Sequence, residues 1–293
     1  MSQDELNRNK LPRLVAPKPY QILCLSGGGY RGLYTAALLE KLEAQAGKPL
    51  SQVFDLVAGT SIGGILALGV AAGVAARDLA AAFEQNADNI FPKRRIIFGK
   101  KLLPRFAYGL FKARYPQTGL KQTLETILGS KAQAKVQDLS TKVLVSSVEL
   151  TSGSPRIFRS SDASCDTPLV DIGLATSAAP TFFPQHLVGD AIVVDGGLVA
   201  NAPDMLAIFE ALQYEQLADL RLVSVGTAGR EGAKAYRKQR SPGVMFGGKS
   251  TFFLTLDAQE RLSVQAAQDL LRDRYVRLDA DPSQEERESI GPM

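Results

Sequence analysis

The chain has 293 residues, of which 45% are hydrophobic and 22% charged, so it is long enough to bury a sizeable core. Its net charge of +4 is too small to indicate nucleic-acid binding, although it is compatible with contact to an anionic surface. The two cysteines, Cys24 and Cys165, form no disulfide framework or zinc-binding pattern, and we expect no metal. Residues 1–19 are polar and proline-rich without the apolar core of a signal peptide, which predicts a cytoplasmic location.

The first half of the chain alternates between strand and helix patterns. Residues 1–18 are expected to form a flexible arm, followed by a buried strand at 20–26 and a helix that ends near Gly47. A second strand is expected at 53–60. The apolar stretch 62–76 is shorter than the ~20 residues that span a bilayer, so it predicts a core helix.

The second half continues this alternation. Strands are expected at 142–150, 191–195 and 220–227, helices at 77–88, 169–179 and 257–273, and a last strand at 275–281. Alternating strands and helices favour an α/β layered fold with a mainly parallel sheet. We find no linker or repeat, so the sequence predicts one domain over residues 19–293 after the arm.

A nucleophile motif links the second strand to the apolar helix. Residues 59–63 read Gly-Thr-Ser-Ile-Gly and match the pattern G-x-S-x-G, with Ser61 at its centre. A sharp turn between strand and helix exposes the serine hydroxyl, and the flanking glycines leave room for the turned backbone. The alternative is that Ser61 only caps the helix, since serine is a preferred N-cap residue.

A serine nucleophile needs a base, and two residues are candidates for that role. Asp195 ends the strand 191–195, and functional side chains gather at the carboxyl ends of parallel strands. We assume that this strand runs parallel to 53–60, which would bring Asp195 to the same sheet edge as Ser61. His186 is the one histidine and would have to serve in a Ser–His–Asp triad, whereas Asp55 begins a strand and belongs at the opposite edge.

A glycine-rich loop follows the first strand. The three consecutive glycines Gly27, Gly28 and Gly29 expose backbone N–H groups, which suits them to bind an oxyanion, and Arg31 can brace the loop or meet a phosphate. Residues 27–32 also match the dinucleotide pattern G-x-G-x-x-G. That reading requires an acidic residue at the end of the second strand, which instead closes with Ala-Gly-Thr.

Two further segments have patterns that suggest a function. Residues 243–250 match the P-loop pattern, but a basic loop ending in Pro242 precedes them where a strand is required. Residues 93–115 contain eight Lys or Arg, no acid, and many large apolar residues. This composition is typical of contact with an anionic membrane, and the alternative is a solvated face of a lid or insertion.

Taken in order, GGGYRG, GTSIG and DGG, with ATSAAPTFFP before the last, resemble the signature blocks of patatin-like phospholipases over residues 20–206. The resemblance implies a three-layer α/β/α fold and hydrolysis of phospholipids or other acyl esters without a cofactor. It implies that Ser61 is the nucleophile, Asp195 the base, and the amides of the glycine loop the oxyanion hole. The further motif positions are Arg31, Gly32, Gly59, Gly63, Gly196, Gly197 and Asn201, the last of which supports the Asp195 loop.

The segments 18–43 and 47–73 also resemble bacterial antiphage patatin effectors of the CBASS signalling systems. This resemblance implies that a cyclic dinucleotide from a partner cyclase activates the protein, which then degrades phospholipid at the inner face of the membrane. Two alternatives stay open at this point. One is a constitutive lipase or esterase of lipid catabolism, and the other is a non-catalytic nucleotide-binding module that uses the same glycine loops.

Overall fold

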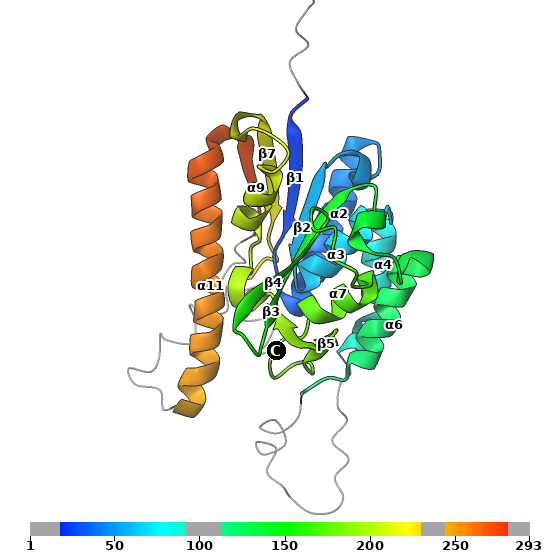
Figure 1. Cartoon of the computed structure of the whole chain (residues 1–293), viewed down its shortest axis with the longest axis vertical. Helices are drawn as coiled ribbons and strands as arrows, with labels where there is room; N and C mark the ends of the chain where they lie inside the picture. Colours follow the sequence, from blue (N-terminus) through cyan, green and yellow to red (C-terminus); the bar gives the residue numbers. More distant parts are fainter. Residues whose placement is uncertain (1–17, 92–112, 230–243, 281–293) are drawn as a thin grey trace, which may run out of the picture.

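The computed structural model describes residues 18–91, 113–229 and 244–280. For residues 244–252 it describes the backbone alone. Within these ranges, eight strands form one sheet with helices on both faces, which gives three layers (Figure 1). The α/β layered fold predicted from the alternating pattern, and the three layers that the family resemblance implies, are therefore confirmed. The predicted arm and most of the basic stretch 93–115 lie outside the described residues.

The core of the sheet is parallel. Its central strands run in the order β3, β2, β1, β7 and β8, and each neighbouring pair in this series is parallel. Antiparallel strands β4, β5 and β6 complete it around β3. The bounds are β1 Tyr20–Leu25, β2 Leu56–Thr60, β3 Lys142–Glu149, β4 Ser154–Arg159, β5 His186–Val188, β6 Ala191–Asp195, β7 Leu220–Val225 and β8 Tyr275–Leu278.

One face of the sheet carries the larger core. The apolar side chains of its helices pack with Leu23, Val57 and Val143 from the strands, and all three are fully buried. Helix α3 is buried at every position, which explains why its sequence is apolar all round. The helices of this face are α2 Gly32–Ala46, α3 Ile62–Ala71, α4 Ala76–Ile90, α6 Gln117–Leu128 and α7 Leu169–Thr176.

The opposite face is covered by the end of the chain. A second cluster there joins Ile22, Leu56 and Leu222 of the sheet to Ile208 and Leu271 of two helices. These helices are α9 (Asp204–Ala211) and the long α11 (Val244–Leu271), which stands alongside the sheet in Figure 1. The short helix α8 (Gly197–Ala200) links β6 to α9, and short 3-10 helices lie at Gly29–Arg31, Leu50–Gln52, Gly129–Lys131, Val136–Asp138, Leu217–Asp219 and Arg272–Arg274.

Strands β2 and β6 lie end to end along one edge of β3. Strand β4 pairs with β3 over 144–149, so it occupies the other edge there. On the shared edge, Thr60 of β2 is opposite Ser146, and Asp195 of β6 is opposite the next residue, Ser147. Because β2 is parallel and β6 antiparallel to β3, their carboxyl ends point toward each other. The prediction that β2 and β6 run parallel was therefore wrong, yet the two ends do meet.

Several element boundaries differ from those expected. Strand β2 begins at Leu56, because residues 50–52 before it form a 3-10 turn. Helix α11 begins at Val244, well before the predicted 257, so most of the P-loop-like motif forms its first turns. Helices α6, α8 and α9 and strands β4 and β5 were not predicted. The two strands are held by antiparallel pairing with β3 and β6, which their own short sequences do not encode.

Candidate active site

Ser61 occupies a strained turn between β2 and α3. Its φ of 55° and ψ of −125° lie outside the regions that non-glycine residues favour, at a cost of about 1–3 kcal/mol. The backbone N–H of Ser61 donates to Thr176 Oγ1 at 2.8 Å, and that hydroxyl donates in turn to the carbonyl of Ser146 at 2.6 Å. These bonds fix the turn, so the side chain of Ser61 is held at the positive end of α3.

The glycines of the motif allow the turn to pack. A Cβ on Gly63 would collide with the carbonyl oxygen of Leu25, and one on Gly59 would collide with the backbone of Gly63. Helix α3 therefore begins in direct contact with the end of β1. This is the close packing that the G-x-S-x-G pattern predicted.

Asp195 lies beside the serine hydroxyl. Ser61 Oγ donates to Asp195 Oδ2 at 2.7 Å, and the N–H of Gly197 donates to Asp195 Oδ1 at 2.6 Å. Asp195 is only 6% exposed. Burial raises its pKa to about 6, against the opposing effect of these two hydrogen bonds. A carboxylate with a pKa near 6 is ionised at neutral pH and still basic enough to accept a proton.

The glycine loop lies above this pair. Gly29 has a φ of 56°, a left-handed conformation that glycine adopts without strain. The N–H of Gly27 donates to the carbonyl of Asn201 at 2.9 Å, so this amide is occupied and does not match the predicted oxyanion role. Within the described ranges, the amides of Gly28 and Gly29 donate to no backbone carbonyl. Both residues line the same cavity as Ser61 and Asp195.

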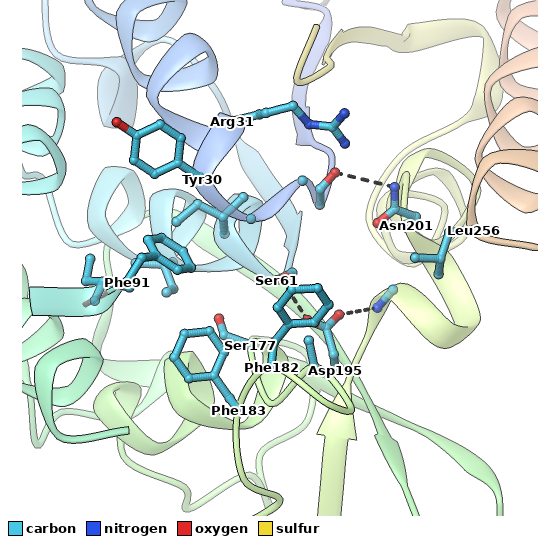
Figure 2. Close-up of a pocket in the computed structure, with 18 of the residues that line it drawn as sticks. Tyr30, Arg31, Ser61, Phe91, Ser177, Phe182, Phe183, Asp195, Asn201 and Leu256 are labelled. Atoms are coloured by element: carbon cyan, nitrogen blue, oxygen red, sulfur yellow. Dashed lines mark hydrogen bonds between the residues drawn. The ribbon is translucent and has the colours of Figure 1, made fainter. Parts of the chain in front are cut away.

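A cavity of about 660 Å³ opens above the serine. Its two sides differ in chemistry, as Figure 2 shows, with aromatic rings on one side of Ser61 and polar groups around Asn201 on the other. The apolar side is formed by Tyr30, Ile65, Ile90, Phe91, Tyr115, Leu120, Phe182 and Phe183. The other side carries Arg31 and Asn201 with Leu256 beside them, and Glu260, which binds Asn201, and Asp257 also line the cavity.

The aromatic side is a packed cluster centred on Phe91. The ring of Phe91 meets those of Tyr30, Tyr115 and Phe183 at centroid distances of 5.9, 5.4 and 6.0 Å. Backbone bonds from Arg114 and Tyr115 to the carbonyls of Thr181 and Phe182 fix one edge of the cluster. Its rigid apolar surface suits a hydrocarbon chain.

His186 lies away from the serine. Its Nε2 is 3.2 Å from Asp171 Oδ1, and burial lowers its pKa against the opposing effect of that carboxylate. His186 is not one of the described residues that line the cavity. Asp55 accepts a hydrogen bond from the N–H of Gln21, at the amino ends of β1 and β2, as its sequence position predicted. The geometry therefore brings only Asp195 to Ser61.

The other predicted motif residues surround the same centre. Gly32 packs against the side chain of Ile62, and Gly196 lies against the backbone of Ser146. Arg31 lines the cavity beside Gly229. Asn201, predicted to support the Asp195 loop, also reaches across to the glycine loop, where its Nδ2 is 3.4 Å from the carbonyl oxygen of Gly27.

Sequence reasoning missed several residues that hold this centre together. Thr176 binds the backbone of Ser61, and the signal was its place in the ATSAAP block. Gln259 and Glu260 of α11 contact Asn201, and Arg277 of β8 contacts Ser26. These three residues carry no short motif, so pattern matching had no means to find them.

Across the described ranges, none of the helices combines the length and apolar character required to cross a membrane.

Comparison with known proteins agrees with this geometry. The family model described as "Patatin-like phospholipase" matches residues 23–208. A "cGAMP-activated phospholipase" of Pseudomonas aeruginosa is 36% identical, over 90% of this chain and 80% of its own. One of the same name from Vibrio cholerae is 35% identical, over 72% of this chain and 65% of its own.

Among solved structures, VipD from Legionella pneumophila aligns with 93% of this chain and 64% of its own, at 12% identity and a TM-score of 0.48. The matched region 23–208 contains the glycine loop, the serine turn and the aspartate turn. On the extent of that match and the identity to its relatives, the chain is a member of the patatin-like phospholipase family.

Proposed function

We propose that this protein hydrolyses acyl esters of membrane phospholipids with Ser61 as nucleophile and Asp195 as general base. The observation that carries the proposal is the 2.7 Å hydrogen bond from Ser61 Oγ to Asp195 Oδ2 at the floor of the cavity. A hydroxyl paired with a buried carboxylate is the arrangement that activates a serine nucleophile.

The reaction would proceed in two halves. As Ser61 Oγ bonds to the ester carbonyl carbon, its proton passes to Asp195, and the carbonyl oxygen becomes an oxyanion facing the amides of Gly28 and Gly29. When this intermediate collapses, the bond to the alcohol oxygen breaks, and the leaving alcohol takes the proton from Asp195. Water then attacks the acyl-serine, with Asp195 again accepting and returning a proton.

The two sides of the cavity favour one orientation of the substrate. The Phe91 cluster would take the acyl chain, because it offers a packed apolar surface next to Ser61. The glycerophosphate part would lie on the side of Arg31 and Asn201, where a guanidinium complements phosphate oxygens.

A fluorophosphonate probe gives the direct test, because it labels activated serines and ignores nucleotide-binding modules. We expect labelling of the wild-type protein and release of fatty acid from phospholipid vesicles, both absent in Ser61→Ala. Absence of labelling and of hydrolysis in the wild-type protein, with activator present, would favour the non-catalytic binding module instead.

We further propose that a cyclic dinucleotide activates the enzyme, as part of antiphage defence. The support comes from three relatives, 36%, 35% and 35% identical, each named "cGAMP-activated phospholipase". This chain spans 80%, 65% and 63% of their lengths. A partner cyclase would supply the activator. Hydrolysis measured with and without a panel of cyclic dinucleotides tests this, and full activity without any of them would favour a constitutive lipase.

The proposed setting is the cytoplasmic face of the membrane, with peripheral contact. The basic and apolar composition of residues 93–115 supports it, since each basic residue near an anionic surface contributes ~1 kcal/mol. Phe91, which precedes this stretch, and Arg114 and Tyr115 at its end all line the cavity. Contact through 93–115 would therefore place the membrane next to the active site.

A further inference from the structure

The glycine loop needs an external support. A run of glycines has more conformational freedom than any other sequence, while catalysis requires oxyanion donors that are fixed before the reaction. The residue before the loop, Ser26, is fully buried and its N–H donates to the carbonyl of Val225 at 3.0 Å. Further contacts to this segment come from Arg277 and Asn201.

Two side chains hold the start of the loop from different directions. Arg277 of β8 donates through Nη1 to Ser26 Oγ at 2.9 Å and to Ser224 Oγ at 2.7 Å. Asn201, in the turn after Asp195, binds Gly27 twice, through its backbone carbonyl and through its side-chain amide. Figure 2 shows the Asn201 side chain reaching from the aspartate turn toward this loop.

Both side chains end on one carboxylate. Glu260 Oε2 accepts from Asn201 Nδ2 at 2.6 Å, and Glu260 Oε1 accepts from Arg277 Nη2 at 2.7 Å. The side chains of Glu260 and Arg277 are only 21% and 16% exposed. Charge-assisted hydrogen bonds of this length, in a partly desolvated setting, are strong enough to fix geometry.

The neighbouring residue on α11 holds the other turn. Gln259 Oε1 accepts from the backbone N–H of Asn201 at 3.1 Å, and its Nε2 donates to the carbonyl of Gly197. Gly197 is the residue whose N–H binds Asp195. Gln259 thus contacts the segment that follows Asp195, and the adjacent Glu260 is linked to the glycine loop through Asn201 and Arg277.

From these contacts we infer that Glu260 and Arg277 are positioning residues that set the oxyanion loop relative to Ser61 and Asp195. Neither residue needs to touch the reacting atoms. Both lie beyond residue 208, where the family match ends. This inference rests on the proposed hydrolase function, but its test includes a readout that does not depend on turnover.

The variants are Glu260→Gln, Arg277→Gln and the conservative Arg277→Lys. The matched control is Glu210→Gln, because Glu210 is a buried carboxylate whose partners are Arg159, at 3.5 Å, and Tyr214, at 3.2 Å. Glu210 is not among the residues that line the cavity. It therefore reports the cost of removing the charge of a buried carboxylate away from the site.

On a soluble short-chain ester, we expect Glu260→Gln and Arg277→Gln each to lower kcat about 10- to 100-fold with KM changed less than threefold. An oxyanion donor acts mainly on the transition state, and loss of one such donor typically costs ~10²–10³-fold. Arg277→Lys should recover part of kcat, since it keeps the charge but cannot make both contacts. The kcat of the double variant should lie within about threefold of the kcat of the less active single variant, because both residues act through the same loop.

Hydrogen exchange supplies the independent readout. The amides of residues 26–31 should exchange faster in Glu260→Gln than in the wild type. In Glu210→Gln their exchange rates should equal those of the wild type. An inactive wild type with this exchange pattern would remove the hydrolase proposal but keep the positioning inference. Wild-type kcat in both Gln variants, an equal kcat loss in Glu210→Gln, or unchanged exchange in Glu260→Gln would overturn it.

Discussion

Ser61 and Asp195 are joined by a 2.7 Å hydrogen bond although the strands that deliver them run toward each other. The two strands share one edge of β3 and stop at adjacent positions on it, Ser146 and Ser147. Their separation is therefore set by the rigid repeat of a single strand. A pair of side chains placed in this way is preorganised by the sheet.

Replacing the nucleophile should separate activity from folding. Ser61→Ala is expected to abolish ester hydrolysis and fluorophosphonate labelling. It should lower the free energy of unfolding by about 1–3 kcal/mol, since it removes one hydrogen bond to a buried carboxylate. Turnover of the purified variant and its thermal melt give both quantities. A variant that kept wild-type turnover would exclude Ser61 as the nucleophile.

Replacing the base should inactivate the enzyme and stabilise its fold. Asp195→Asn removes the proton acceptor, which typically costs ~10²–10⁴-fold. Burial raises the pKa of Asp195 from 3.8 to about 6, so the ionised group destabilises the folded state above pH 6, by at most about 3 kcal/mol. The Asn variant should therefore melt at a higher temperature than wild type at pH 7.5, and the difference should shrink toward pH 4.

His186→Ala is the companion variant, because a Ser–His–Asp triad would require that histidine. We expect it to keep most of its activity, since His186 pairs with Asp171 and not with Ser61. An inactive His186→Ala beside an active Asp195→Asn would reverse the assignment of the base.

The acid limb of the pH–rate profile should report the same carboxylate. As pH falls through about 6, Asp195 becomes protonated and can no longer accept the serine proton, so kcat/KM should decline tenfold per pH unit below that point. A soluble ester avoids effects of pH on vesicles. An activity that stayed constant down to pH 4.5 would show that no group with a pKa near 6 acts as the base.

Charge reversal in the basic stretch should affect binding to membranes alone. Lys93, Arg94 and Arg95 replaced by Glu should weaken sedimentation with anionic vesicles, while hydrolysis of a soluble ester stays within about twofold of wild type. The matched control reverses three exposed bases at or before the amino ends of parallel strands, away from the carboxyl end of β2 that carries Ser61, namely Lys48, Lys135 and Arg221. Equal vesicle binding by both triple variants and wild type would contradict a membrane role for this stretch.

The sequence predicts the centre of this site well because its constraints are local. A strand, a sharp turn and a helix within a few residues leave only small residues at Gly59 and Gly63, and this requirement is visible as a pattern. The sequence predicts the pairing of Ser61 with Asp195 because the carboxyl ends of their strands are expected to meet at one edge of the sheet. The direction of β6 was wrong because register and direction depend on pairing with β3, which is not encoded within β6 itself.

The support from α11 and β8 could not be predicted for a different reason. Glu260 reads as one acid on the polar face of an amphipathic helix, and Arg277 as an ordinary base in a short strand. Only the three-dimensional packing places them around Ser26 and Asn201. Long-range polar contacts of this kind follow no periodic pattern along the sequence, so neither composition nor residue spacing predicts them.

The placement of the Glu260–Arg277 pair late in the chain has a consequence for biosynthesis. Ser61 and Asp195 leave the ribosome well before residues 260 and 277, so a nascent or prematurely terminated chain can contain the complete dyad without the support of its oxyanion loop. If positioning by this pair is required for turnover, such incomplete chains would be poor lipases. The order of synthesis would then protect the membrane of the producing cell until each molecule is finished.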